Sequence, residues 1–153
     1  MPMPAFPKAL VAAACSLLCV AATPAGSGQP TATSPVMVVV SDLASTTSVV
    51  KLYFYNIREN FLKPGHYTML KRVNPDGQSK LVLPVNLEPG EWAVAITQDV
   101  NNNDKLDKNM VGIPTEPYGF SNNFRPRLAA PDFDDCKFTV EGPGKVVTIN
   151  LVK

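Results

Sequence analysis

The sequence predicts an all-β protein, a single β-sandwich of about seven strands with one long ordered loop. Short runs of alternating apolar and polar residues recur along the chain, with turn signals between them. The chain also holds 15 prolines, and no apolar pattern of helical spacing continues for more than about two turns. Together these observations favour an immunoglobulin-like or a transthyretin-like sandwich over an α/β fold.

Residues 1–25 are typical of a secretory signal peptide. Lys8 precedes an apolar run at 9–22 that is too short to span a membrane. Small residues follow, and signal peptidase could cut after Ala22 or Ala25. We therefore predict a periplasmic or secreted protein with no membrane span after cleavage. A retained N-terminal anchor and lipidation at Cys15 are the alternatives.

Cleavage would leave Cys136 as the single thiol of the mature chain, which excludes an internal disulfide. We expect this thiol to be buried rather than reactive, because the neighbouring carboxylates would raise its pKa. The whole chain has 14 Lys and Arg against 13 Asp and Glu. Since Lys8 leaves with the leader, the mature part is balanced and shows no overall charge excess for nucleic acid or for an anionic membrane.

Residues 26–35 are rich in Gly, Pro, Ser and Thr, which predicts a flexible linker before a domain at 36–153. Alternation within the domain is clear at 48–56, where Val50 and Leu52 face one way and Lys51 and Tyr53 the other. One helical turn at most is expected at 58–63. The expected strands lie at 36–41, 48–56, 67–73, 79–85, 91–98, 136–140 and 145–152.

The stretch from 99 to 131 has no strand periodicity, and long loops of this kind are functional or tied down. Oxygen-bearing residues open it at the first, third, fifth, seventh and ninth places, a spacing that can wrap oxygens around Ca²⁺. Leu106 would pin the loop to the core, and Glu116 could fold back as a further ligand. The predicted ligands are Asp99, Asn101, Asn103, the backbone carbonyl of Lys105, Asp107 and Glu116.

Two positions depart from a helix-flanked calcium loop. Asp104 stands at the sixth place, where Gly is expected, and Met110 stands at the twelfth, where a bidentate Glu is expected. Asp can adopt the positive φ that the sixth place requires. The alternative interpretation is an Asn/Asp-rich surface turn that satisfies itself through side-chain to backbone hydrogen bonds.

The acidic loop is followed by Gly-Ile-Pro-Thr-Glu at 112–116 and by Gly-Phe-Ser at 119–121. With Pro-Gly-Glu-Trp at 89–92 and Pro-Asp-Phe at 131–133, this pattern resembles the bacterial family catalogued as domain of unknown function 2141. The resemblance covers most of the mature chain and implies an exported bacterial β-sandwich, without assigning an activity. In that family the sixth place of the acidic loop is usually Gly, so Asp104 departs from it.

One interpretation of the segment 108–131 is a ligand pocket beside the ion. Its predicted binding residues combine aromatic anchors with polar groups: Tyr118, Phe120, Asn122, Asn123 and Arg125. Arg125 and Arg127 could also hold an anion. The alternative is a loop held by aromatic packing and by Asn–backbone hydrogen bonds.

No residue set is predicted to be catalytic. His66 is the sole histidine and has no neighbouring nucleophile or metal ligand in the sequence. The leading prediction is therefore an exported, non-enzymatic module, stabilised by Ca²⁺, that binds a protein, peptide or glycan in the cell envelope. The alternative from another class is a small periplasmic hydrolase that uses Glu116 and Ser121 with Asp132 or Asp135. A purely structural envelope protein is a third.

Overall fold

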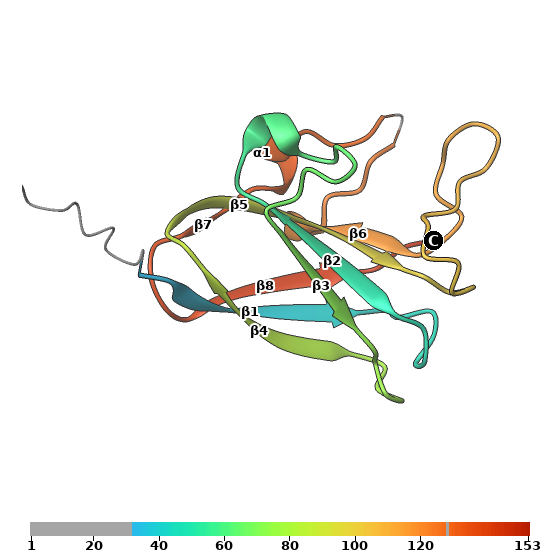
Figure 1. Cartoon of the computed structure of the whole chain (residues 1–153), viewed down its shortest axis with the longest axis horizontal. Helices are drawn as coiled ribbons and strands as arrows, with labels where there is room; N and C mark the ends of the chain where they lie inside the picture. Colours follow the sequence, from blue (N-terminus) through green and yellow to red (C-terminus); the bar gives the residue numbers. More distant parts are fainter. Residues whose placement is uncertain (1–31, 128) are drawn as a thin grey trace, which may run out of the picture. The chain divides into compact units, whose positions relative to one another are not determined.

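The computed structural model describes residues 32–127 and 129–153. The predicted signal peptide and residues 26–31 of the linker lie outside the described residues. The described residues belong to one compact unit. Its described strands form one sheet of three and one of five, which pack face to face as the predicted β-sandwich (Figure 1).

The smaller sheet has the order β4-β1-β8. Its central strand β1 (Ser34–Ser41) pairs antiparallel with β4 (Leu81–Leu87) and parallel with β8 (Lys145–Asn150). β1 begins two residues before the strand expected at 36–41, since Ser34 and Pro35 already pair with β4. Pro is tolerated there because it occupies the beginning of the strand.

The larger sheet has the order β3-β2-β5-β6, and a further short strand pairs with the beginning of β5. All its pairings are antiparallel. The strands of this sheet are β2 (Val50–Tyr55), β3 (Met69–Val73), β5 (Gly90–Gln98), β6 (Tyr118–Phe120) and β7 (Phe138–Val140). The two sheets together contain each of the seven expected strands, and β6 is an addition.

The strand expected at 136–140 is shorter than predicted, because Cys136 ends the helical turn α1 (Phe133–Cys136). Asp132 and Asp135 form a reciprocal capping box, in which the Asp135 carboxylate accepts the Asp132 N–H at 3.0 Å. This local capping outweighs the strand-like alternation. Cys136 is nevertheless buried, as predicted. Burial first, and then the charge of Asp135, raise the pKa of its thiol to about 12.

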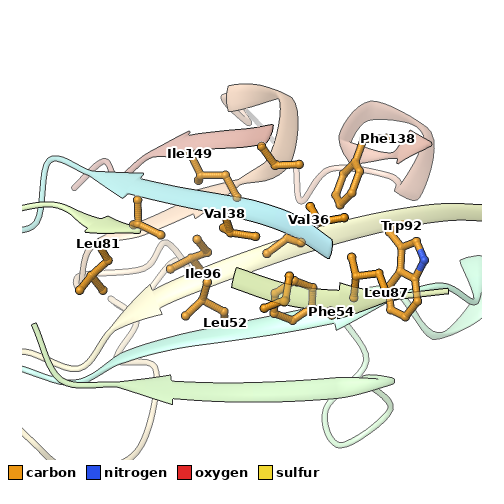
Figure 2. Close-up of a cluster of buried hydrophobic side chains, with 14 of the residues drawn as sticks. Val36, Val38, Leu52, Phe54, Leu81, Leu87, Trp92, Ile96, Phe138 and Ile149 are labelled. Carbon is orange, nitrogen blue, oxygen red and sulfur yellow. The ribbon is translucent and has the colours of Figure 1, made fainter. Parts of the chain in front are cut away.

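The main core lies between the two sheets (Figure 2). β1 contributes Val36, Val38 and Val40, which are fully buried. Trp92 lies at one end of this core, and its indole N–H donates to the Glu88 carbonyl at 2.9 Å. The opposing side chains from the larger sheet include Leu52, Phe54 and Ile96. The alternation predicted for the segment of β2 therefore has its expected cause: Val50, Leu52 and Phe54 face this core.

A second cluster covers the outer face of the larger sheet. It begins with Tyr55, Ala93 and Ala95, which alternate with the core-facing residues of β2 and β5. Against them pack α1, the turn after the 3-10 helix η1 (Arg58–Asn60), and the partly buried Tyr53, Phe61, Leu62, Tyr67, Phe120 and Phe124. The expectation of one buried face is therefore wrong for β2 and β5, which are buried on both sides.

Gly119 allows β6 to lie against β8 of the other sheet. A methyl group at this position would lie 2.8 Å from the Ile149 Cγ2 and 3.1 Å from the Leu151 Cδ2. Beside it, the backbone of Tyr118 exchanges two hydrogen bonds with Val152, at 2.9 and 2.8 Å. The end of the long loop is thereby joined to the residues that follow β8.

We predict that Gly119→Ala destabilises the domain by about 1–3 kcal/mol, because the added carbon overpacks a site with no free space. Gly142→Ala is the matched control, since nothing lies within 4 Å of its added carbon. It should change stability by less than about 1 kcal/mol. Urea denaturation measures both. Equal losses for the two variants would show that the contact between β6 and β8 does not require Gly119.

Candidate functional site

The candidate site begins where β5 ends and the long loop leaves the sheet. Asp99 is buried there, and its backbone N–H donates to the Val49 carbonyl at 2.9 Å. The Lys51 Nζ lies 2.9 Å from the Asp99 Oδ2, and their side chains are only 5% and 6% exposed. Lys51 projects from the outer face of β2, where Thr97 and Arg72 are its cross-strand neighbours. A buried ion pair therefore fixes the first residue of the loop.

Asp104 completes this ion pair from the sixth place of the loop. It adopts the predicted positive φ, at 64°. Its Oδ1 lies 2.8 Å from the Lys51 Nζ and 3.2 Å from the Arg72 Nη1. The departure from Gly thus has a structural explanation, because the side chain supplies a second carboxylate to a buried ammonium group.

The ionisation of these groups follows from the same contacts. Burial alone would raise the pKa of Asp99, but hydrogen bonds from Lys51 and from the Asp104 N–H outweigh it and hold the pKa below its ordinary value. Burial opposes the charge of Lys51, yet its hydrogen bonds to Asp104 and Asp99 raise its pKa. The hydrogen bond from Lys51 is the first cause that lowers the pKa of Asp104. All three groups are therefore charged at neutral pH.

The side chains at the first, third, fifth and ninth places turn into the loop, where they hydrogen-bond to one another and to its backbone. The Asp99 Oδ1 and the Asn101 Oδ1 both accept the Asn103 N–H, at 3.1 and 3.2 Å. The Asn103 Oδ1 accepts the Lys105 N–H at 2.9 Å. The Asp107 Oδ2 accepts the side-chain amides of Asn101 and Asn103, at 2.6 and 2.8 Å.

Glu116 folds back toward the beginning of the loop, as predicted. It is buried, and its Oε1 accepts the Val100 N–H at 2.9 Å while its Oε2 accepts the Asp107 N–H at 3.3 Å. One carboxylate thus holds two points of the loop together. Leu106, which was expected to pin the loop to the core, is instead exposed. That prediction is wrong, because hydrogen bonds and the Lys51 ion pair do the anchoring.

The predicted ligand set has the chemistry of a hard-cation site. It combines carboxylate, amide and backbone oxygens, which suit Ca²⁺ rather than Zn²⁺. Over the described ranges, no three His, Cys, Asp or Glu side chains are grouped so that they could hold a metal ion. An ion would therefore depend on Asn101 and Asn103, and it would replace their hydrogen bonds to Asp107. The carbonyl of Lys105 stays a predicted ligand.

A cavity of about 420 Å³ opens beside the ion pair. Its lining comes from β2, β3 and the loop, namely Val49, Lys51, Arg72, Val73, Asn74, Asp99, Asn102 and Asp104. This position differs from the pocket expected within 108–131. Arg72, Asn74 and Asn102 were not among the predicted site residues, and only their cross-strand and loop neighbours bring them together.

The predicted binding residues of the later loop have contacts within the domain. Tyr118 and Phe120 are half-buried in β6, with ring centroids 5.8 Å apart. Asn122 donates to the Lys137 carbonyl at 2.9 Å, and Asn123 accepts the Asn150 N–H at 2.8 Å. These are the aromatic and Asn–backbone contacts of the alternative interpretation. Arg125 is exposed, and a ligand role for these residues stays a prediction.

The residues of the hydrolase alternative are occupied by backbone contacts. Ser121 is fully buried in the 3-10 helix η2 (Ser121–Asn123), where its Oγ accepts the Val94 N–H at 2.9 Å and donates to the Cys136 carbonyl. Asp132 and Asp135 cap α1. A nucleophile must reach its substrate, and these positions offer no such access to Ser121.

A bacterial family described as "Uncharacterized protein conserved in bacteria (DUF2141)" matches residues 38–148. The chain belongs to this family. The match runs from β1 into β8 and includes the whole long loop, so the resemblance noted in the sequence is confirmed. Neither a curated protein nor a solved structure matches the chain. No helix in the described part of this DUF2141 chain is long and apolar enough to cross a membrane.

The long loop of this DUF2141 domain contains a projecting hairpin, which we call the tip and define as residues 105–114 (Figure 1). Lys108 pairs with Pro114 across it, and the Asn109 Oδ1 accepts the N–H groups of Val111 and Ile113, at 3.1 and 2.9 Å. Met110, Val111 and Ile113 are exposed. The sequence signal for this feature was three apolar residues within four positions of a turn.

We predict that Lys51→Met destabilises the DUF2141 domain by about 3–5 kcal/mol, because it leaves the buried Asp99 carboxylate without its partner. Lys137→Met is the matched control. It removes a lysine whose ion pairs with Glu91 and Asp134 are solvent-exposed, so it should cost about 1 kcal/mol or less. Denaturant titration compares the two. A Lys51→Met loss no larger than that of the control would contradict the anchoring role.

Proposed function

We propose that this chain is an exported, non-enzymatic binding module of the bacterial cell envelope, periplasmic or secreted. Its long loop would be stabilised by Ca²⁺ and would recognise a protein, peptide or glycan. The ordered loop at 99–116 carries this proposal, because it turns its polar side chains inward and keeps a fixed shape on the surface. Loops held on a rigid scaffold are the usual place for binding sites.

The calcium part of the proposal is supported by the inward turn of the side chains at the first, third, fifth and ninth places. Asp99, Asp107 and Glu116 would supply negative charge, with neutral oxygens from Asn101 and Asn103. Because Lys51 already neutralises part of this charge, we expect weak affinity. Extracellular modules bind Ca²⁺ at about 10⁻⁴–10⁻³ M, which matches the proposed location.

Binding is favoured over hydrolysis by the contacts of the candidate catalytic groups. Ser121 is buried and hydrogen-bonded to the backbone, while Asp132 and Asp135 cap a helix. Arg125 and the tip are exposed on the same long connection. Export is supported by the signal-peptide composition of residues 1–25. In an oxidising compartment the Cys136 thiol would be protected from oxidation, because it is buried.

Removal of Ca²⁺ from the chain 26–153 should lower its melting temperature, and Ca²⁺ should restore it better than Mg²⁺. At free Ca²⁺ tenfold above Kd, the gain in stability is about 1.4 kcal/mol, or roughly 5 °C. Asp107→Asn should abolish the calcium response. Asp76→Asn, an exposed turn residue elsewhere, is the matched control and should keep it. A melting curve that excess chelator leaves unchanged would refute the calcium role.

A further inference from the structure

The tip has the shape and charge of a lipid-docking element. We propose that the tip, residues 105–114, docks on an anionic phospholipid surface, with the apolar side chains inserted among the lipids and the lysines at the headgroups. This inference adds a lipid surface to the partners proposed above, and it does not require bound calcium.

The apolar side chains of the tip are unusually exposed. Met110, Val111 and Ile113 have 104%, 77% and 56% of their surface accessible to solvent. Single exposed apolar residues are ordinary, but three at the end of one projecting turn are a candidate contact surface. Because the hairpin projects away from the sandwich (Figure 1), the described part of the domain does not cover them.

The tip is also held in one conformation. Asn109 accepts the N–H groups of Val111 and Ile113, and its own N–H donates to the Ile113 carbonyl at 2.9 Å. At the base of the hairpin, the Thr115 N–H donates to the Asp107 carbonyl at 2.8 Å. A preformed tip loses little conformational entropy when it inserts, which favours binding.

Two lysines of the tip lie behind its apolar turn. Lys108 pairs with Pro114, one step behind the apolar turn, and Lys105 lies nearer the base. Both lysines are exposed, and neither has an ion pair within the described part of the chain. This order, apolar residues outermost and cations behind them, matches the order of acyl chains and phosphates in a bilayer surface.

The tip has a small excess of positive charge. Within it Lys105 and Lys108 stand against one carboxylate, Asp107, while Asp99 and Asp104 pair with Lys51 and Glu116 is buried. Two lysines less one aspartate give the tip a net charge of +1, although the chain as a whole is nearly neutral. Negatively charged headgroups are the complementary surface.

The test is co-sedimentation of the chain 26–153 with vesicles of phosphatidylcholine, with and without phosphatidylglycerol. We expect binding to the anionic vesicles, and a loss of roughly tenfold or more when Met110→Ser, Val111→Ser and Ile113→Ser are combined. Lys105→Gln and Lys108→Gln should each weaken binding about fivefold and reduce its salt dependence.

A matched control is available on the outer face of the smaller sheet. Val82 and Val146 are 55% and 58% exposed, so Val82→Ser with Val146→Ser removes exposed apolar surface outside the tip. This variant should bind vesicles like the unchanged chain. Melting curves of all variants should coincide, because the substituted side chains are exposed.

Three outcomes would overturn the inference. The first is equal vesicle binding by the tip variant and the control variant. The second is an absence of binding to the anionic vesicles, and self-association that the tip variant abolishes would then make a second copy the occupant. The third is equal binding to vesicles with and without phosphatidylglycerol, which would contradict recognition of an anionic surface. Vesicle binding in a chain that lacks a calcium response would refute the calcium proposal alone.

Discussion

The buried ammonium group of Lys51 fixes the position of the whole candidate site. It projects from the outer face of β2, lies within 2.9 Å of the Asp99 carboxylate and within 2.8 Å of that of Asp104. Without it, a carboxylate at the end of β5 would be buried without a compensating charge, at a cost of several kcal/mol. Because the ion pair compensates this charge, the polar loop can begin at a buried residue directly after β5.

The rest of the connection follows from this anchor. The Asp99 carboxylate accepts the N–H groups of Asn103 and Asp104, which bends the chain back. Glu116 then joins Val100 to Asp107, so the two strands of the loop run side by side out to the tip. Once the chain returns, β6 pairs with β5 and Gly119 allows it to lie against β8. The same anchor thus contributes to the closure of the sandwich.

The sequence predicted the fold well where alternation was strong. In β2, β5 and β8 core-facing apolar residues recur at every second position, and that period has only one structural meaning. β6 was missed because it has three residues and a glycine at its centre. α1 was missed because its capping box lies within an acidic run, where two carboxylates are easily taken for a solvated surface.

The site was partly predictable for similar reasons. Local spacing indicated the inward turn of Asp99 and Asn103, and the positive φ of Asp104, because these depend on residues close in the sequence. The role of Lys51 could not be found, since its partner Asp99 is 48 residues away and only the pairing of β2 with β5 brings them together. The exposure of Leu106 also depended on contacts outside its own segment. Features that depend on residues close in the sequence were therefore predicted, whereas features that depend on pairing between distant strands were not.

Amide hydrogen exchange of the chain 26–153 in the presence of a chelator tests the anchoring of the loop most directly. The amides of Asn103 and Asp104 donate to the buried Asp99 carboxylate, so their exchange should be slowed as it is in the strands. The Asn102 amide, in the same exposed turn, provides the internal comparison. Exchange of the Asn103 and Asp104 amides at the rate of an unstructured peptide would contradict the anchoring by Lys51 and Asp99.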